Sequence, residues 1–481
     1  MCQFWSPKTL VVGVLLLGLG ACAGNPSRPP PATSDATQTA CLAAFNDADR
    51  RVARAGVGDA DSAPVAGFPY LRVNRLLASF TTTPMDAPGR SAWLARLAAL
   101  DTDGRKIEMA ALGAPTTTLD HCRHQLVASL LTSGTAWDTL LRAATVPDDY
   151  RQFQRVLGLY PVAARFARRG IARLQKTENP QPHLDIPANA RVYATPAAVA
   201  DATATTHAFA NADHDALGFP ILVAPVLAAL FAQHAPVWVV ASASEDDHIG
   251  TITRRATGTP LVAAPPSVYR YASYTRFENQ VLLQLNYVIW FPARPAVGRF
   301  DSLAGKFDGL TWRVTLDTDG VPLAFDTLHN CGCYHLWFPT TRLRLRPVDP
   351  ADGEPPWVAD SLAPRSRIGV QLAAGTHMVR GVGPAPPHPP VLLEVRDYTT
   401  LRGLPGPAGA PRSLFAPDGL VPGSQRGERY LLWPFGVPSA GAMRQRGHHA
   451  TAFVGVRHFD EARLLERYFS RAASAQGPTS R

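Results

Sequence analysis

The most concentrated set of reactive side chains in this chain is the stretch His329-Asn330-Cys331-Gly332-Cys333-Tyr334-His335. Its seven residues hold two of the six cysteines and two of the fourteen histidines. Thiolate and imidazole are ligands that zinc and copper prefer. Two cysteines separated by one residue can also form a small, strained disulfide that is easily reduced. The stretch is therefore a candidate site for metal binding or for thiol redox chemistry.

Strand geometry limits how these side chains can cooperate. Side chains alternate between the two faces of a strand, so the four Cys and His residues would share one face of an unbroken strand. At about 3.3 Å per residue, His329 and His335 would lie about 20 Å apart and would not meet at one ion. A metal site therefore requires a bend at Gly332 or further ligands. The candidates for such ligands are His448, His449 and His458.

Three interpretations of the stretch remain open. In the first, Cys331 and Cys333 form a structural disulfide and the histidines are hydrogen-bonded core residues. In the second, zinc or copper activates a water molecule in a metal-dependent enzyme, such as a hydrolase of envelope material. Its candidate ligands are Cys331, Cys333, His335, His329, His448 and His449. In the third, the Cys-Gly-Cys segment is a thiol redox pair. The structural interpretation is favoured, because isolated motif matches are often accidental.

Other clusters of potential ligands are better explained by local structure. His121 and His124 are three residues apart in an expected helix, and a solvated helix start explains them. The acid-histidine segments at 213–215 and 245–248 are typical of surface turns. The sequence contains no Gly-x-Ser-x-Gly elbow, no His-Glu-x-x-His helix and no P-loop. Several common hydrolase and nucleotide-binding classes therefore lose support.

The first residues carry the most specific signal in the chain. Lys8 precedes an apolar segment, Thr9 to Gly20, which has the length of a signal-peptide core. The following Leu19-Gly20-Ala21-Cys22 resembles the lipobox of bacterial lipoproteins. That resemblance implies a signal peptide over residues 1–21, a lipid on Cys22 and, because Ala23 rather than aspartate follows, the outer membrane with the body facing the periplasm. An ordinary cleaved signal peptide is the alternative.

This compartment affects the remaining cysteines. With Cys2 removed and Cys22 lipidated, four cysteines are left in an oxidising environment, where disulfides form. A long-range disulfide between Cys41 and Cys122 is expected to stabilise the fold by a few kcal/mol. Cys331 and Cys333 are then a local pair.

The charge distribution limits the range of partners. The net charge is +9 and the isoelectric point about 9.4, but the basic residues are spread along the chain without runs of like charge. A nucleic-acid partner is therefore not expected. The expected partners are the membrane, through the lipid anchor, and an envelope protein or glycan.

The pattern of elements predicts an α+β fold. A proline-rich tether is expected over residues 22–40, followed by a helical bundle over 41–185. A mixed, strand-rich and loop-heavy body with antiparallel hairpins should cover 186–471, and a disordered tail 472–481. The 44 prolines among 481 residues are consistent with long irregular connections.

The strand-like pattern begins at Phe277. The nearly unbroken apolar run from Val281 to Phe291 predicts a buried central strand. Residues 310–316 alternate between apolar and polar up to the turn at 317–320, which predicts a hairpin. The returning strand would put the Cys and His residues on the same inward face as Leu323 and Phe325. A further strand is expected over 451–456, and a final helix capped by Asp460.

From sequence alone, we expect a lipid-anchored periplasmic protein with a structural or binding role in the envelope. The metal-dependent enzyme and the thiol redox protein are the alternatives.

Overall fold

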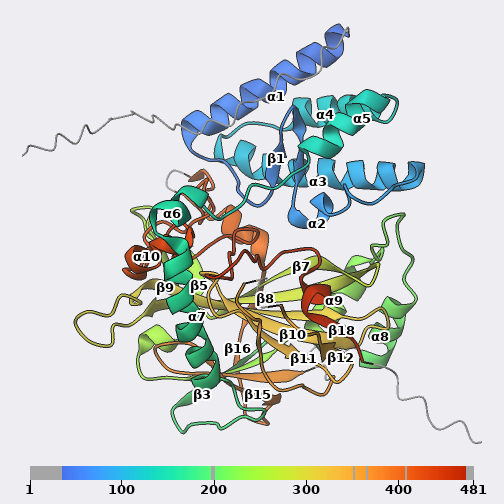
Figure 1. The fold of residues 1–481 in the computed structure, drawn as a ribbon. Helices are drawn as coiled ribbons and strands as arrows, with labels where there is room; N and C mark the ends of the chain where they lie inside the picture. Colours follow the sequence, from blue (N-terminus) through green and yellow to red (C-terminus); the bar gives the residue numbers. More distant parts are fainter. Residues whose placement is uncertain (1–34, 197–200, 350–352, 365–366, 407–408, 473–481) are drawn as a thin grey trace, which may run out of the picture.

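The computed structural model describes residues 35–196, 201–349, 353–364, 367–406 and 409–472. The signal peptide, Cys22, most of the tether and nearly all of the expected tail lie outside these ranges. The fold is α+β as predicted, with 32% helix and 27% strand. In Figure 1 the N-terminal helices form a layer on top of a strand-rich body. No helix within the described ranges is both long and apolar enough to cross a membrane.

The N-terminal layer consists of five helices packed around one short hairpin. Its elements are α1 (Ala36–Ala55), β1 (Ala63–Val65), β2 (Phe68–Val73), α2 (Arg75–Ala78), α3 (Ala87–Ala111), α4 (Thr117–Leu130) and α5 (Gly134–Ala143). The helix α1 begins at Ala36, within the expected tether, because the Asp35 side chain caps it by accepting a hydrogen bond from the Thr37 amide. The predicted disulfide between Cys41 and Cys122 is confirmed and joins α1 to α4.

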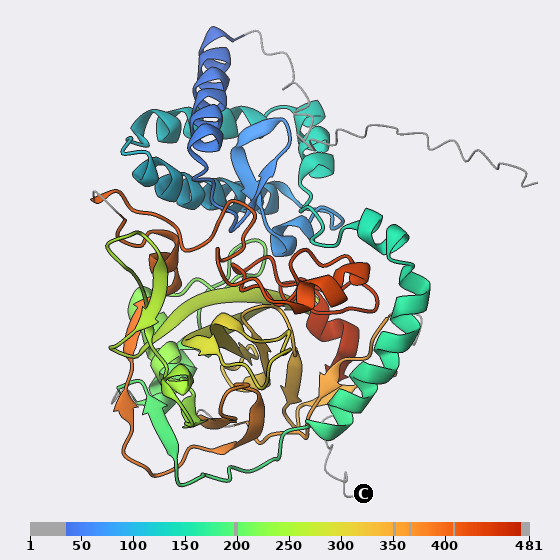
Figure 2. The same ribbon diagram turned by 90° about the vertical axis from the view of Figure 1, so that its left-hand side faces the viewer.

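The next two helices do not belong to that layer. We predicted that α6 (Gln152–Leu157) and α7 (Tyr160–Thr177) would extend the helical bundle. Instead, α7 runs down the side of the strand-rich body (Figure 2). Its inward side, including Leu174, packs on the core of the body, and Gly158 between the helices lies against Pro434. Most of its other side chains are exposed, so the body is its main packing partner.

The body contains two large sheets. The seven-stranded sheet has the order β13-β11-β10-β9-β8-β7-β17, and the five-stranded sheet β15-β14-β4-β3-β16. Strands β7 to β11 form an antiparallel meander, while β13 and β17 pair in parallel at its two edges. The sheets share the largest hydrophobic core, which includes Trp238 and Val370 from one sheet and Leu283 and Trp312 from the other.

The strand bounds of the larger sheet are β7 (Ser267–Phe277), β8 (Gln280–Arg294), β9 (Gly305–Leu316), β10 (Pro322–His329), β11 (Leu336–Pro339), β13 (Trp357–Val358) and β17 (Glu394–Asp397). Those of the smaller sheet are β3 (Ala190–Ala194), β4 (Val237–Ala241), β14 (Ile368–Leu372), β15 (Val379–Pro384) and β16 (Val391–Leu392). Two further pairs are β5 (Thr251–Arg254) with β6 (Pro260–Ala263), and β12 (Leu343–Leu345) with β18 (Phe469–Arg471). The helices of the body are α8 (Ala202–Ala210), α9 (Ala224–Gln233), η1 (Glu245–Asp247), η3 (Tyr398–Arg402), α10 (Glu428–Leu431), η5 (Trp433–Phe435) and α11 (Leu464–Tyr468).

The central strand and the hairpin are confirmed. The run from Val281 to Phe291 lies within β8 and is fully buried. Its odd-numbered residues from Leu283 to Phe291 face the five-stranded sheet, while Gln284 and Asn286 face the other way. Strands β9 and β10 pair across the predicted turn, with Leu316 opposite Pro322.

Two local predictions near the C-terminus are wrong. Residues 451–456 form no strand, because the Tyr150 hydroxyl and the Glu354 carboxylate take up several of the backbone groups that a strand partner would use. The final helix, α11, follows Arg463 and is not capped by Asp460. The Asp460 carboxylate instead lies 3.2 Å from the guanidinium of Arg75 in α2.

The disulfide gives a first prediction. It closes a loop with a sequence separation of 81 residues, so its loss should increase the conformational entropy of the unfolded chain. We expect the variant Cys41→Ala/Cys122→Ala to lose about 2–4 kcal/mol of unfolding free energy in urea titrations. Reduced wild-type protein is the matched control and should show a similar loss. Equal stability of the oxidised wild type and the variant would contradict this role.

Candidate functional site

The Cys-Gly-Cys stretch forms a tight turn between two strands. Strand β10 ends at His329, whose amide donates to the Cys333 carbonyl at 3.0 Å, and β11 begins at Leu336. Gly332 has a φ of +91°, and a Cβ atom there would lie 2.9 Å from the Ala450 carbonyl oxygen. Only glycine fits this backbone without strain. The chain therefore bends at Gly332.

This turn places the two histidines on opposite faces of the sheet. His329 lies on the same face as Leu310, in the core between the two sheets, as strand parity predicted. His335 lies on the other face, where its Nε2 atom is 2.8 Å from the Asp326 carboxylate. The prediction that all four Cys and His residues share the inward face is thus wrong, because the turn shifts the parity of the chain.

The two cysteines are free thiols in contact with each other. The structural disulfide expected between them is absent. The hydrogen bond from the Cys333 thiol lowers the pKa of Cys331, since it stabilises a thiolate there. The same contact, together with burial, raises the pKa of Cys333. One proton therefore leaves the pair easily and the second only with difficulty.

The six candidate metal ligands do not converge. The Nδ1 atom of His329 lies 3.6 Å from the Asp308 carboxylate, and Asp308 also binds His377 and Arg426. His448 Nδ1 lies 2.9 Å from Asp149, and His449 Nε2 lies 3.2 Å from the Asn330 carbonyl. Among the residues that the structure describes, no three His, Cys, Asp or Glu side chains form a group that could hold a metal ion. The geometry thus gives the zinc or copper interpretation no support.

A buried row of three side chains extends from His335 across the sheet. Asp326 on β10 accepts two hydrogen bonds from Arg313 on β9, at 2.9 and 2.6 Å, and a third from His335. Burial alone would raise the pKa of Asp326, but the Arg313 charge and the His335 hydrogen bond lower it. Burial lowers the pKa of His335 to about 4, against the partial opposition of Asp326. At neutral pH the row is therefore a carboxylate between a guanidinium and a neutral imidazole.

His335 and Cys333 line a cavity of about 230 Å³, which we call the thiol–imidazole cavity. Helix α7 forms one wall of this cavity, and residues 450–453 form another. Its polar lining residues are Cys333, Tyr334, His335, Glu354, Glu428, Thr451, Arg457 and Gln175. The Nδ1 atom of His335 has no hydrogen-bond partner within the described chain. The His335 side chain is 0% exposed, so this nitrogen lies within the wall and does not face the cavity.

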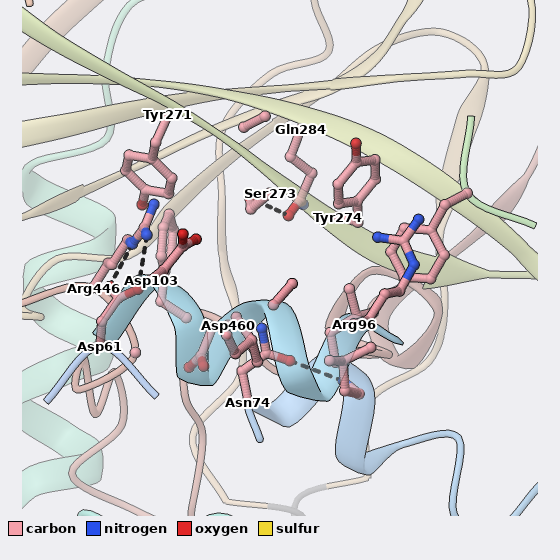
Figure 3. A pocket seen from close by; sticks show the side chains of 18 of the residues that line it. Asp61, Asn74, Arg96, Asp103, Tyr271, Ser273, Tyr274, Gln284, Arg446 and Asp460 are labelled. Atoms are coloured by element: carbon pink, nitrogen blue, oxygen red, sulfur yellow. Dashed lines mark hydrogen bonds and ion pairs between the residues drawn. The ribbon is translucent and has the colours of Figure 1, made fainter. Parts of the chain in front are cut away.

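A second cavity, of about 280 Å³, lies between the helical layer and the seven-stranded sheet; we call it the interdomain cavity (Figure 3). Asn74, Arg96 and Asp103 come from the helices and the loop before α2, while Tyr271, Ser273, Tyr274 and Gln284 come from β7 and β8 on the opposite side (Figure 3). Residues 446, 447, 459 and 460 complete the lining. Three distant parts of the chain therefore build one cavity.

The positive charges of the interdomain cavity are neutralised within the protein. Each of its three arginines has a carboxylate oxygen 2.6 Å away: Asp215 for Arg96, Asp326 for Arg313 and Asp61 for Arg446. All three guanidiniums also cover aromatic rings, at 3.5 Å for Phe219, 3.6 Å for Phe459 and 4.9 Å for Tyr271. The cavity is thus lined by arginine–aromatic stacks that carry little net charge.

The free hydrogen-bonding groups in the interdomain cavity are mainly hydroxyls. Those of Tyr271 and Tyr274 have no hydrogen-bond partner among the described residues. Burial raises the pKa of Tyr271 to about 12 and also raises that of Tyr274, so both stay protonated at neutral pH. These residues were not predicted as site residues, because the strand-like pattern was recognised only from Phe277, the last residue of β7. The alternating Tyr269, Tyr271 and Ser273 were the available signal.

One irregular segment, residues 446–460, separates the two cavities. Gly447 and Phe459 line the interdomain cavity, while residues 450–453 and Arg457 line the thiol–imidazole cavity. His448 and His449, predicted as metal ligands, anchor this segment through Asp149 and the Asn330 carbonyl. Comparison with family models, with curated proteins and with solved structures found no match to this chain.

The buried histidines predict a pH dependence of stability. In the folded protein the pKa of His335 is about 4 and that of His449 about 3, both lowered chiefly by burial from 6.5. Between pH 6.5 and pH 4 the unfolded chain therefore binds more protons, so stability is complete above this window and falls as the pH falls through it. We expect urea titrations to show a loss of up to about 1.4 kcal/mol per pH unit for each histidine.

The variant His449→Gln keeps a donor for the Asn330 carbonyl and should show a shallower pH slope than the wild type. His207→Gln, on the exposed helix α8, is the matched control and should keep the wild-type slope. An unchanged slope in His449→Gln would show that this histidine is not held neutral in the folded state.

Proposed function

We propose that this protein is a membrane-held binding protein whose interdomain cavity takes a neutral sugar or another polyhydroxylated ring. The observation that carries the proposal is the chemistry of that cavity, in which unpaired hydroxyls and aromatic rings accompany arginines that are already paired. This is the binding role expected from sequence, with a glycan as the partner.

The charges of the cavity argue against an anionic ligand. A phosphate or carboxylate site needs unpaired donors or a free cation, whereas Arg96, Arg313 and Arg446 each bind a carboxylate. The Asp103 carboxylate forms no ion pair with another described residue and is exposed at the cavity, where it can accept hydrogen bonds from a ligand. The lining therefore favours a ligand that donates hydroxyl hydrogens and carries no negative charge.

The remaining surface argues against a purely apolar ligand. Leu76, Leu100 and Phe219 supply apolar area, but Ser273 and Gln284 are hydrogen-bonded at 3.1 Å within the same lining. Ligand sites typically combine an apolar lining with a few fixed polar groups. A sugar ring offers apolar C–H faces for the aromatic rings and hydroxyls for the tyrosines and carboxylates.

The test is calorimetric titration of the full-length protein with glucose, N-acetylglucosamine and maltotriose, with glucose 6-phosphate as the anionic comparator. At least one neutral saccharide should bind, and the phosphate should bind more weakly than glucose. Tyr271→Phe and Tyr274→Phe each remove one hydroxyl, so each should lower the affinity by about 1 kcal/mol, or roughly five-fold.

Tyr430→Phe is the matched control, because Tyr430 is exposed and lies outside the cavity. A second variant, Ala99→Trp, adds bulk to the helical wall of the cavity and should abolish binding. If no neutral saccharide binds, or if the tyrosine variants bind as the wild type does, the interdomain cavity is not a sugar site.

A surface next to α7 supports membrane attachment, which the lipobox resemblance predicted. Exposed apolar side chains occur on α6, the start of α7, α10 and the connection between β8 and β9. These elements are linked by contacts, since η5 touches α6, α7 and α10, and the Glu428 amide in α10 donates to the Ser302 carbonyl of that connection. We call this surface the apolar face. It comprises Phe153, Val156, Leu157, Leu159, Val162, Phe166, Val297, Phe300, Tyr430 and Leu431. Exposed apolar side chains grouped on neighbouring elements are typical of a protein or membrane contact.

Charge favours an anionic bilayer over a protein as the occupant of the apolar face. Helix α7 contains no acidic residue. Its exposed cations are Arg165, Arg168, Arg169, Arg173 and Lys176. Apolar side chains next to such a row are typical of helices that lie in the headgroup region of membranes. This contact would supplement the lipid on Cys22.

The membrane contact is tested with a Cys22→Ser variant, which carries no lipid, in sedimentation with phosphatidylglycerol vesicles. We expect binding that weakens at least ten-fold when Val162→Ser and Phe166→Ser are added, because both side chains would leave the bilayer. Ile221→Ser with Val223→Ser is the matched control, since these apolar residues are also exposed but lie near α9. Binding that is absent, or equal in both double variants, would contradict a bilayer as the occupant.

A further inference from the structure

The thiol–imidazole cavity holds a buried acceptor that the proposed function does not use. The His335 side chain is fully buried, and the Asp326 carboxylate fixes its Nε2 atom as the hydrogen-bond donor. This fixes the tautomer, so Nδ1 carries the lone pair. Buried polar atoms without a partner are rare in folded proteins. This nitrogen is closed off from the cavity, so a ligand there meets the His335 backbone and not its imidazole.

The acceptor that the cavity does expose is the Glu428 carboxylate. It is 8% exposed, and no hydrogen bond or ion pair to this carboxylate occurs in the described part of the chain. Burial raises its pKa, and the charges of Arg426 and Arg294 oppose this only in part. The nearby Glu354 differs, because it already binds Arg457 at 2.8 Å and two backbone amides at 3.0 and 3.2 Å.

The hydrogen-bond donors of the lining are largely occupied. Arg457 donates to Glu354 and to the carbonyl and hydroxyl oxygens of Thr451. The two thiols bind each other. An anionic ligand would therefore find few donors, and it would face the Glu428 carboxylate. A ligand that carries hydrogen-bond donors and a positive charge would instead be attracted by the Glu428 carboxylate.

The rest of the lining suits an organic cation. Tyr334, Trp357 and Phe453 contribute aromatic rings, which attract ammonium groups. The apolar wall consists of Ile171, Leu174, Leu432, Ala450 and Ala452. A cavity of about 230 Å³ accommodates a small molecule of this kind.

We propose that the thiol–imidazole cavity is a binding site for a small organic amine, whose ammonium group donates to the Glu428 carboxylate and whose carbon chain packs on the apolar and aromatic lining. The inference concerns a different cavity from the proposed sugar site and does not depend on it.

Cys333 provides a direct readout, because it lines the cavity and is partly exposed, whereas Cys331 is buried. The probes are 1,4-diaminobutane and ethanolamine, with 1,4-butanediol as the uncharged comparator. Alkylation of Cys333 by iodoacetamide in the full-length protein is followed by peptide mass spectrometry. At least one amine should slow alkylation ten-fold or more at saturation, and the diol should not.

Two variants test the assignment of the acceptor. Glu428→Gln should lose the protection given by the amine, because the negative charge is removed while the shape is kept. Glu394→Gln, an exposed residue on β17, is the matched control and should keep the protection. Comparing rates with and without amine within each variant cancels any change in intrinsic thiol reactivity.

A second variant, Leu174→Trp, tests the same proposal if Glu428→Gln fails to fold. It fills the cavity from α7 without altering a polar group, and it should abolish protection by the amine. The proposal is overturned if no amine protects Cys333, if the diol protects it equally, or if amines protect Glu428→Gln or Leu174→Trp as they do the wild type. Saccharide binding in the interdomain cavity is measured separately, so failure of one site is distinguishable from failure of the other.

Discussion

Both cavities depend on one buried carboxylate, that of Asp326 in the seven-stranded sheet. It is held between the guanidinium of Arg313, which lines the interdomain cavity, and the imidazole of His335, which is buried in the wall of the thiol–imidazole cavity. Removing one member of such a buried pair typically costs 3–5 kcal/mol, because the partner charge remains buried without compensation. Asp326 therefore fixes the orientation of a side chain in each cavity at once. The row also requires the turn at Gly332, since only the shift in parity brings His335 to the face of Asp326.

Both cavities also depend on the segment from residue 446 to residue 460. It is buried yet irregular, so its backbone groups must find partners outside a regular sheet. The Tyr150 hydroxyl donates to the carbonyl oxygens of Ala452 and Arg457. The Glu354 carboxylate accepts hydrogen bonds from the amides of Phe453 and Val454. His448 and His449 also hold this segment in place, through Asp149 and the Asn330 carbonyl. Histidines that suggested metal chemistry in the sequence thus position the wall between two cavities.

The sequence predicted those features whose cause is local. The burial of β8 follows from its continuous apolar run, and the β9–β10 hairpin from alternation and an Asp-Gly turn. The long-range Cys41–Cys122 disulfide was predicted for a different reason, namely the small number of cysteines. The cavities were not predicted, because Asn74, Tyr274 and Asp460 come together only through tertiary packing. The strand expected over 451–456 does not form for the same reason, because side chains of distant residues hydrogen-bond to the backbone groups that a partner strand would use. Amphipathic periodicity placed α7 in a helix but did not identify the surface that its apolar side covers.

The geometry at Gly332 also affects what conservation of the Cys-Gly-Cys motif among relatives would mean. Its positive φ and the close Ala450 carbonyl exclude any larger residue, whatever the two thiols do. The backbone therefore requires the glycine between the two cysteines, whatever residues flank it. Relatives that retain a glycine here would be under selection for a turn that places His335 next to Asp326. In such relatives, persistence of the motif would be evidence of this geometry and would not by itself identify a redox pair or a metal site.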